Sequence, residues 1–198
     1  MNYVITIGRQ FGSGGRSIGK YIAEKLNIPY YDSELITLAA EKFGLDSDVC
    51  KQNDEKSSKA LVGLFSSIPS GYYYPMYNDM IKDTLFQAQA EIIREVAVKP
   101  CVIVGRCSDY ILKDKPNVFK VFLYADVESR KKRLIERYGT TEKLEKLLAK
   151  ADKQRANYYN YYTDWVWGQK ENYDICISTS KLTAAEVGDI IIGICGKK

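Results

Sequence analysis

The residues best suited to chemistry lie in one glycine-rich stretch, GRQFGSGGRS, which follows the apolar run YVITI and precedes the helical pattern IGKYIAEKL. Three of its glycines allow the backbone to curl until successive N–H groups converge on an anion: Gly12, Gly14 and Gly15. Arg16 adds a permanent charge with forked donors suited to phosphate, and Ser17 a hydroxyl placed to coordinate Mg²⁺. The stretch predicts a phosphate-binding loop; a glycine turn that only packs a helix on a sheet is the alternative.

Histidine is absent from the chain. Its absence excludes Ser-His-Asp and Cys-His catalysis and histidine-ligated metal sites. The net charge of +4 is small, and no block of lysines and arginines of the nucleic-acid-binding type is present. An anionic small molecule is therefore favoured as the partner over a nucleic acid.

A length of 198 residues with 45% hydrophobic and 27% charged residues is typical of one globular domain. The five cysteines form no CxxC pair, and three lie in or beside apolar runs, so we expect core residues in a reducing compartment. No apolar segment reaches transmembrane length, and the first residues enter a strand directly. These features predict a cytoplasmic protein without membrane association.

Strand and helix patterns alternate along the chain. Apolar runs predict buried parallel strands at residues 3–7, 101–104, 118–124 and 173–178, with a short fifth strand at 28–32. Helical spacing predicts helices at residues 17–26, 80–98, 127–138, 141–162 and 183–194. Asp126 is the expected N-cap of the third helix, and Thr183 with Glu186 forms a capping box for the last. The alternation predicts an α/β fold with right-handed crossovers.

Two polar residues follow predicted strands, and the carboxyl ends of parallel strands are where ligands collect. Asp32 follows the short strand and can take a substrate hydroxyl or a metal-bound water, or cap a helix. Arg106 follows the strand at 101–104 and can contact a substrate phosphate, or pair structurally with Asp109.

Charged and aromatic residues mark two later helices. Arg130, Arg133 and Arg137 share one face of the helix at 127–138, which can bind phosphates or be a solvated basic face. Asp152 and Arg155 share a face of the next helix, where a surface ion pair is the alternative. The aromatic run YYNYYTDWVWG can stack a base or pack the helix on the core.

Residues 12–36, GSGGRSIGKYIAEKLNIPYYDSELI, resemble the nucleoside monophosphate kinases, which carry G-x-G-K-G-T, a helix, and a short strand ending in L-D-S-G. Gly12, Gly14, Ser17 and Asp32 fall on this pattern. The stretches GRQFGSGGR, VGRCSDYIL and DKQRANYYNYYTDWVWG resemble the bacterial cytidylate kinase-like family, and the resemblance covers nearly the whole chain.

The resemblance implies a three-layer P-loop kinase fold with a parallel five-stranded sheet flanked by helices. It implies a single domain over residues 1–198, with a mostly helical acceptor-binding insertion and a lid. We place the core at about residues 1–43 and 79–198, the insertion at about 44–78 and the lid at about 130–165.

The resemblance also implies transfer of the ATP γ-phosphate to a nucleoside monophosphate, with CMP or another pyrimidine nucleotide favoured. ATP and Mg²⁺ are the implied cofactors, with Ser17 on the metal. The implied phosphate-binding residues are Gly12, Ser13, Gly14, Gly15, Arg16 and Ser17. The implied catalytic residues are Arg16, Arg130 and Arg155, and the implied acceptor-binding residues are Asp32, Arg106 and Asp152.

The chain departs from the family pattern at two positions. The loop lysine falls on Gly15, with Arg16 one place later, and the arginine that follows D-S-G falls on Leu38. Two alternatives therefore stay open. One is a nucleotide-binding regulator without turnover, and the other is a kinase for another small phosphorylated or hydroxylated metabolite.

Overall fold

The computed structural model describes residues 3–32, 35, 37–38, 42, 75–139 and 143–195. The predicted insertion at 44–78 lies mostly outside the described residues. The chain divides into two compact units, residues 1–32 with 96–198 and residues 33–95, and each is described by itself. The second unit is wider than the predicted insertion.

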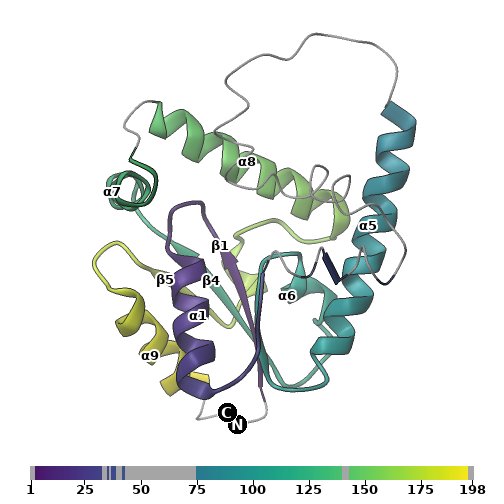
Figure 1. Cartoon of the computed structure of the whole chain (residues 1–198), viewed down its shortest axis with the longest axis horizontal. Helices are drawn as coiled ribbons and strands as arrows, with labels where there is room; N and C mark the ends of the chain where they lie inside the picture. Colours follow the sequence, from purple (N-terminus) through teal and green to yellow (C-terminus); the bar gives the residue numbers. More distant parts are fainter. Residues whose placement is uncertain are drawn as a thin grey trace. The chain divides into compact units, whose positions relative to one another are not determined.

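A parallel five-stranded sheet organises the first unit, with the strand order β2-β3-β1-β4-β5 (Figure 1). The strands are β1 (Val4–Arg9), β2 (Tyr30–Tyr31), β3 (Cys101–Val104), β4 (Val118–Tyr124) and β5 (Ile175–Ser178). The central strand β1 pairs with β3 and β4, so that Ile5 lies opposite both Val102 and Phe119. The predicted α/β class with a five-stranded parallel sheet is confirmed.

In the first unit, the helices α1 (Gly15–Leu26), α7 (Val127–Tyr138), α8 (Leu144–Tyr162) and α9 (Ala184–Cys195) begin and end close to the predicted positions. The short helix α6 (Ser108–Ile111) and the 3₁₀ turn η1 (Lys170–Asn172) were not predicted. The Asp126 carboxylate accepts from the Ser129 amide at 2.7 Å, which confirms the cap of α7. The capping box of α9 is also confirmed, because Thr183 and Glu186 each accept from the other's backbone amide.

Helices α1 and α9 pack together on one face of the sheet (Figure 1). The core on this side is built from side chains at every second strand position, as the two-residue repeat of a strand requires. It contains Ile5, Ile7, Val102, Val104, Val121 and Leu123 from the strands, and Ile18, Ile22, Val187 and Ile191 from the helices. This packing holds the first turn of α1 beside the end of β1.

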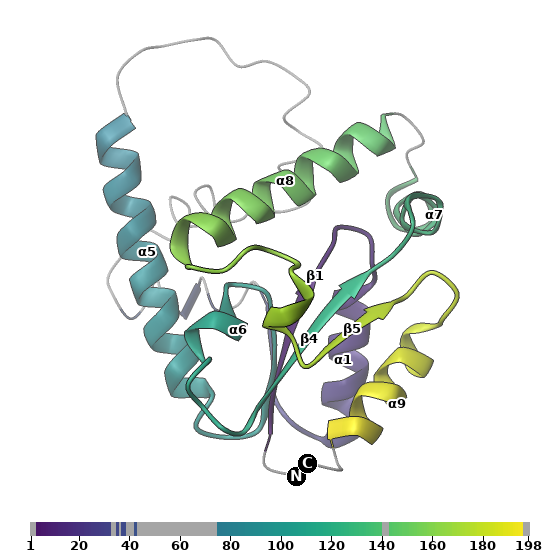
Figure 2. The same cartoon turned by 180° about the vertical axis from the view of Figure 1, so that it is seen from behind.

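On the opposite face, the segment with η1 lies over the sheet (Figure 2), and aromatic side chains pack together there. The Phe122 ring of β4 packs against Trp167 and Tyr173, with ring centroids 5.5 and 5.0 Å away. Gly8 and Gly168 leave room for this cluster, since a Cβ at Gly8 would lie 2.9 Å from the Phe122 ring. Trp167 therefore packs on the core.

The second unit contains α5 (Pro75–Val96) up to Glu95. The helix begins earlier and ends earlier than the predicted helix at 80–98. Leu85, Ala88 and Ile92 are buried, and Lys42 forms an ion pair with Glu95. Within the described part of the chain, no helix is long and apolar enough to cross a membrane.

Candidate phosphate-binding site

The glycine-rich loop joins the end of β1 to the start of α1, as predicted. Gly12 and Gly14 have φ angles of 80° and 85°, a left-handed conformation that glycine adopts without steric cost. The buried Ser13 hydroxyl donates a 2.9 Å hydrogen bond to the Gln10 carbonyl, and the Gln10 amide donates to Leu123 of β4. The loop conformation is therefore fixed by its own sequence and by the neighbouring strand.

The loop opens at the carboxyl edge of the sheet, where the N-terminus of α1 points its amide groups. Gly14 is the N-cap of α1 and no side chain caps this end. The first amides of a helix attract anions because they have no partner within the helix and lie at the positive end of its dipole. Arg16 and Ser17 follow in the first turn, with the Arg16 side chain 40% exposed and Ser17 exposed.

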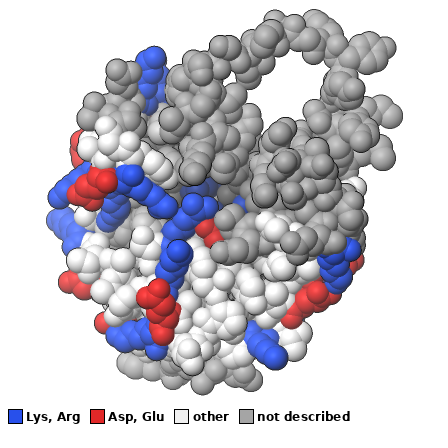
Figure 3. All heavy atoms as spheres, in the orientation of Figure 1, with Lys and Arg blue, Asp and Glu red and all other residues white. Residues whose placement is uncertain are grey.

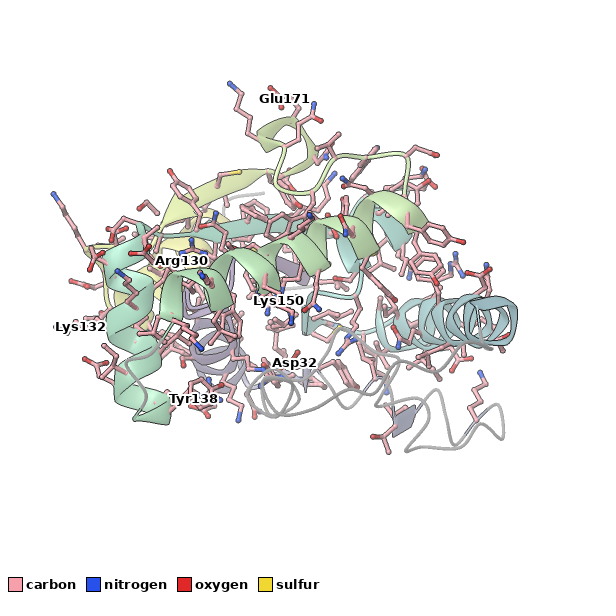
Figure 4. The ribbon with its side chains drawn as sticks, turned by 90° about the horizontal axis from the view of Figure 1, so that it is seen from above. Asp32, Arg130, Lys132, Tyr138, Lys150 and Glu171 are labelled. Carbon is pink, nitrogen blue, oxygen red and sulfur yellow. The ribbon has the colours of Figure 1, made fainter. Side chains whose placement is uncertain are left out.

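Arg130 of α7 and Asp152 of α8 form hydrogen bonds with the backbone of Phe11 in the loop. The two carboxylate oxygens of Asp152 accept from the Phe11 amide, at 2.7 Å, and from Nη1 of Arg130. The same Nη1 donates to the Phe11 carbonyl at 3.2 Å. In the view from above, Arg130 lies where α7 comes close to α8 (Figure 4). Arg130 is also close to Gly12, where a Cβ would lie 3.1 Å from the Arg130 Cβ.

Two further arginines of these helices hold the loop and the strand before it. Arg133 donates to the Gly12 carbonyl at 3.4 Å and to the Thr179 hydroxyl at 3.2 Å. Arg155 donates to the Arg9 carbonyl at 3.0 Å, and its guanidinium carbon lies 5.4 Å from the centroid of the Phe11 ring. Charged side chains of α7 and α8 therefore form hydrogen bonds with backbone groups of the loop and of the end of β1.

The carboxylate of Asp32, just beyond β2, lies close to Arg16 in the first turn of α1 and to Arg9 at the end of β1. Asp32 is 4% exposed and accepts from Nε of Arg16 through one oxygen. Its other oxygen lies 3.8 Å from Nη2 of Arg9, the last residue of β1. Two residues predicted for different parts of the site, Arg16 and Asp32, are thus in direct contact.

Arg106 follows β3 in a strained turn. Gly105, Arg106 and Cys107 have successive φ angles of 78°, 61° and 52°, and a left-handed non-glycine residue costs about 1–3 kcal/mol. Such strain persists where the surrounding structure requires it, and here the strained residues come directly after the end of β3.

The guanidinium of Arg106 is buried, with 3% of the residue exposed. Burial, together with the nearby cations of Arg9 and Arg16, lowers the pKa of Arg106 to about 10 against the opposing effects of Tyr158 and Asp32. Arg106 therefore lies within electrostatic reach of both Arg16 and Asp32.

The carboxylate of Asp109, the alternative partner predicted for Arg106, accepts a 2.7 Å hydrogen bond from the Tyr159 hydroxyl of α8. Burial raises the pKa of Asp109, and burial with the nearby carboxylate raises the pKa of Tyr159. This contact ties α8 to α6, the short helix that follows Arg106.

All the predicted site residues lie in the first unit and surround the same edge of the sheet. Lys and Arg side chains gather over α7 and the N-terminal part of α1 (Figure 3). Arg9, whose guanidinium lies 3.8 Å from the Asp32 carboxylate, was not among the predicted site residues. Its position at the end of a buried strand was the available signal, since the same reasoning identified Asp32 and Arg106.

A divalent metal fits the oxygen groups present. Among the described residues, no cluster of three or more His, Cys, Asp or Glu side chains could hold a metal ion. Mg²⁺ at phosphate-transfer sites needs fewer protein ligands, because substrate phosphates and water complete its shell. The exposed Ser17 hydroxyl and the Asp32 carboxylate are groups of the required kind.

Known proteins match this chain along most of its length. Residues 4–181 match the cytidylate kinase-like family. A cytidylate kinase of Methanosarcina barkeri is 25% identical over 190 residues, which cover 94% of this chain and 93% of that protein.

Solved structures share the fold. The crystal structure of an uncharacterized protein from Eubacterium ventriosum has a TM-score of 0.75 and 30% identity, with 99% of both chains covered. A gluconokinase from Sinorhizobium meliloti has a TM-score of 0.59 and 15% identity, covering 99% of this chain and 93% of that one. At that identity the likeness concerns the fold alone.

Proposed function

Because this chain belongs to the cytidylate kinase-like family, we propose that it transfers the γ-phosphoryl group of ATP to a nucleoside monophosphate, with CMP or another pyrimidine nucleotide favoured. It is a kinase of the type that acts on nucleoside monophosphates or small metabolites, built on the P-loop kinase fold. The observation that carries the proposal is the loop at Gly12–Ser17, which opens beside Asp32 and Arg106 at one edge of the sheet.

The proposed reaction exchanges one phosphorus–oxygen bond for another. The bond between the γ-phosphorus and the β–γ bridging oxygen breaks, and ADP keeps the electron pair. A bond forms between the γ-phosphorus and a phosphate oxygen of the acceptor, which becomes a nucleoside diphosphate. Positioning and charge neutralisation supply most of the catalysis in such transfers, so a chain without histidine can perform it.

In this proposal the loop amides of residues 12–17 bind the β-phosphate, and Arg16 binds the transferring group. Ser17 would coordinate Mg²⁺ and Asp32 could accept from a metal-bound water, and the metal when bound would neutralise phosphate charge. Arg16 must exchange its contact with Asp32 for phosphate oxygens, and its 40% exposed side chain is accessible to them.

Arg130 and Arg155 act on the transferring group from the lid side. Nε of Arg130 is buried and makes no hydrogen bond with the described residues, so this donor can serve a phosphate oxygen. Asp152 contributes through the loop, because its two oxygens accept from Phe11 and Arg130. Arg106 and Asp32 bind the acceptor. Closure of the lid excludes water and so prevents hydrolysis of ATP.

A second candidate is a kinase for another small phosphorylated or hydroxylated metabolite. The observation in its favour is Leu38, which stands where cytidylate kinases carry an arginine for the monophosphate, and which is 38% exposed. Arg106 would then bind an anionic group of a different acceptor.

A coupled ADP-release assay with ATP and Mg²⁺ tests the proposal across the nucleoside monophosphates. We expect release to rise with CMP or UMP and to fall strongly in Arg16→Ala, while Arg94→Ala, at an exposed position of α5, behaves as wild type. If none of the acceptors raises ADP release above background while ATP binding is intact, the kinase proposal is contradicted and a nucleotide-binding regulator is favoured.

A further inference from the structure

Arg9 is the last residue of β1 and is 8% exposed. Its backbone lies opposite Leu123 of β4, and its carbonyl oxygen accepts the hydrogen bond from Arg155 of α8. Because the backbone is held by the sheet and by the lid helix, the direction of the Arg9 side chain is set by the fold.

The aliphatic part of this side chain crosses the start of α1 at Gly15. A Cβ at Gly15 would lie 3.1 Å from Cβ and 3.0 Å from Cγ of Arg9, inside the optimum of about 3.5–4.0 Å between packed carbon atoms. The stem of Arg9 therefore occupies the space in which any side chain at position 15 would begin. Position 15 is where the loop lysine of the nucleoside monophosphate kinases falls. A lysine there and Arg9 compete for the same space.

The guanidinium of Arg9 lies against the backbone of Gly105, at the end of β3. A Cβ at Gly105 would overlap the guanidinium, and Gly105 also has a φ of 78°. Nη2 of Arg9 is 3.8 Å from the Asp32 carboxylate, and the charge of Arg9 affects Arg106. The Arg9 guanidinium therefore lies between the loop and the residues proposed to bind the acceptor.

From these contacts we infer that Arg9 supplies, from the end of β1, the cation that phosphate-binding loops usually supply from their lysine. Arg9 binds the phosphoryl group as it moves between a nucleoside triphosphate and the acceptor, and the identity of this ligand rests on the proposed function. Charge on the equatorial oxygens of the transferring group needs fixed donors, which a guanidinium held by packing provides. Arg9 forms no covalent bond and moves no proton.

Moving the cation between the two positions tests this inference. The variants are Arg9→Met, Arg9→Lys, Gly15→Lys and the double variant Arg9→Ala with Gly15→Lys, beside the control Arg94→Ala. Each full-length protein is measured for its affinity for ATP with Mg²⁺ by titration calorimetry, for its melting temperature and for ADP release.

Arg9→Met is expected to weaken ATP binding about 10–100-fold, the size of one lost hydrogen-bonded contact to a charged group, with melting close to wild type. Arg9→Lys keeps the charge and retains part of the affinity. Gly15→Lys alone binds ATP more weakly, because the lysine stem meets Arg9. The double variant binds ATP more tightly than either Arg9→Met or Gly15→Lys, because the lysine then has room.

Wild-type affinity in Arg9→Met overturns the inference. So does a folded double variant that binds ATP no better than Gly15→Lys. If Arg9→Met does not fold, the ATP affinities of Arg9→Lys and of the double variant decide. The inference stands if Arg9→Lys retains part of the affinity and the double variant binds ATP more tightly than Gly15→Lys, and it is overturned otherwise.

The same titrations with inorganic tripolyphosphate separate this inference from the proposed function. If the wild-type protein releases no ADP with any acceptor, the transfer reaction is refuted. A loss of tripolyphosphate affinity in Arg9→Met still supports Arg9 as the loop cation, and an unchanged affinity refutes it.

Discussion

The hydroxyl of Tyr159 in α8 donates a 2.7 Å hydrogen bond to the buried carboxylate of Asp109 in α6. Asp109 lies three residues after Arg106, so this hydrogen bond holds the turn that carries Arg106 against α8. We expect Tyr159→Phe to lower the free energy of unfolding by about 1–3 kcal/mol, because a buried carboxylate loses its donor. Denaturant titration at pH 7 measures this change, and Tyr161→Phe, at an exposed position, is the control.

The same pair gives a dependence of stability on pH. Burial raises the pKa of Asp109 above its unfolded value, so the folded protein holds this proton at a pH where the unfolded chain has released it. The contribution of Asp109 to stability is therefore greatest below the unfolded pKa and declines as pH rises through the folded pKa. In Tyr159→Phe the loss of the donor raises the pKa further, so the decline extends to higher pH. Equal slopes for wild type and Tyr159→Phe above pH 4 contradict this account.

Asp152→Asn is expected to weaken ATP binding. The substitution removes the charge that pairs with Arg130, while an amide oxygen can still accept from the Phe11 amide, so the loop keeps one of its two restraints. We expect the KM for ATP to rise about tenfold, which corresponds to about 1.4 kcal/mol.

The control for Asp152 is Asp189→Asn, which removes the exposed ion pair between Lys25 and Asp189. Exposed pairs contribute little, so both KM and melting should stay near wild type. A rise in KM of similar size in both variants would mean that the contact with the loop has no special role.

Arg106→Met should separate stability from acceptor binding. Burial of the guanidinium disfavours its charged form, so its replacement by an apolar side chain of similar length should leave the melting temperature unchanged or raise it. The KM for the acceptor should rise about tenfold or more while the KM for ATP changes little. Steady-state kinetics with each substrate varied in turn measure both values, and a larger effect on ATP than on the acceptor refutes the assignment of Arg106.

The cap of α7 gives a prediction at low pH. The amide of Ser129, with the hydroxyls of Ser180 and Ser129, lowers the pKa of Asp126 to about 2. The stabilisation by this carboxylate is complete above its unfolded pKa and is lost as pH falls through the folded value. Asp126→Ala should therefore melt below wild type at pH 7, and the difference should shrink as pH falls from 4 toward 2. A difference that stays constant over this range contradicts the role of the charge.

Several elements followed directly from local sequence patterns. The strands at Cys101–Val104 and Val118–Tyr124 and the helix at Val127–Tyr138 have the predicted bounds. Each is specified by features within a few residues, namely an apolar run buried on both faces or a capping Asp126 before a helical pattern. Helix α6 was missed because four residues are too few for a helical period to be recognised.

The glycine-rich loop, its place between a strand and a helix, and the strand-end positions of Asp32 and Arg106 could be predicted from local sequence, because each depends on spacing along a short stretch of chain. Which side chains meet could be read only from the folded chain. Arg9 lies over Gly15 and against Gly105 because β1 and β3, far apart in sequence, pair in parallel and end at the same edge. Contacts between residues distant in sequence depend on how the sheet and its helices pack, which local propensity does not specify.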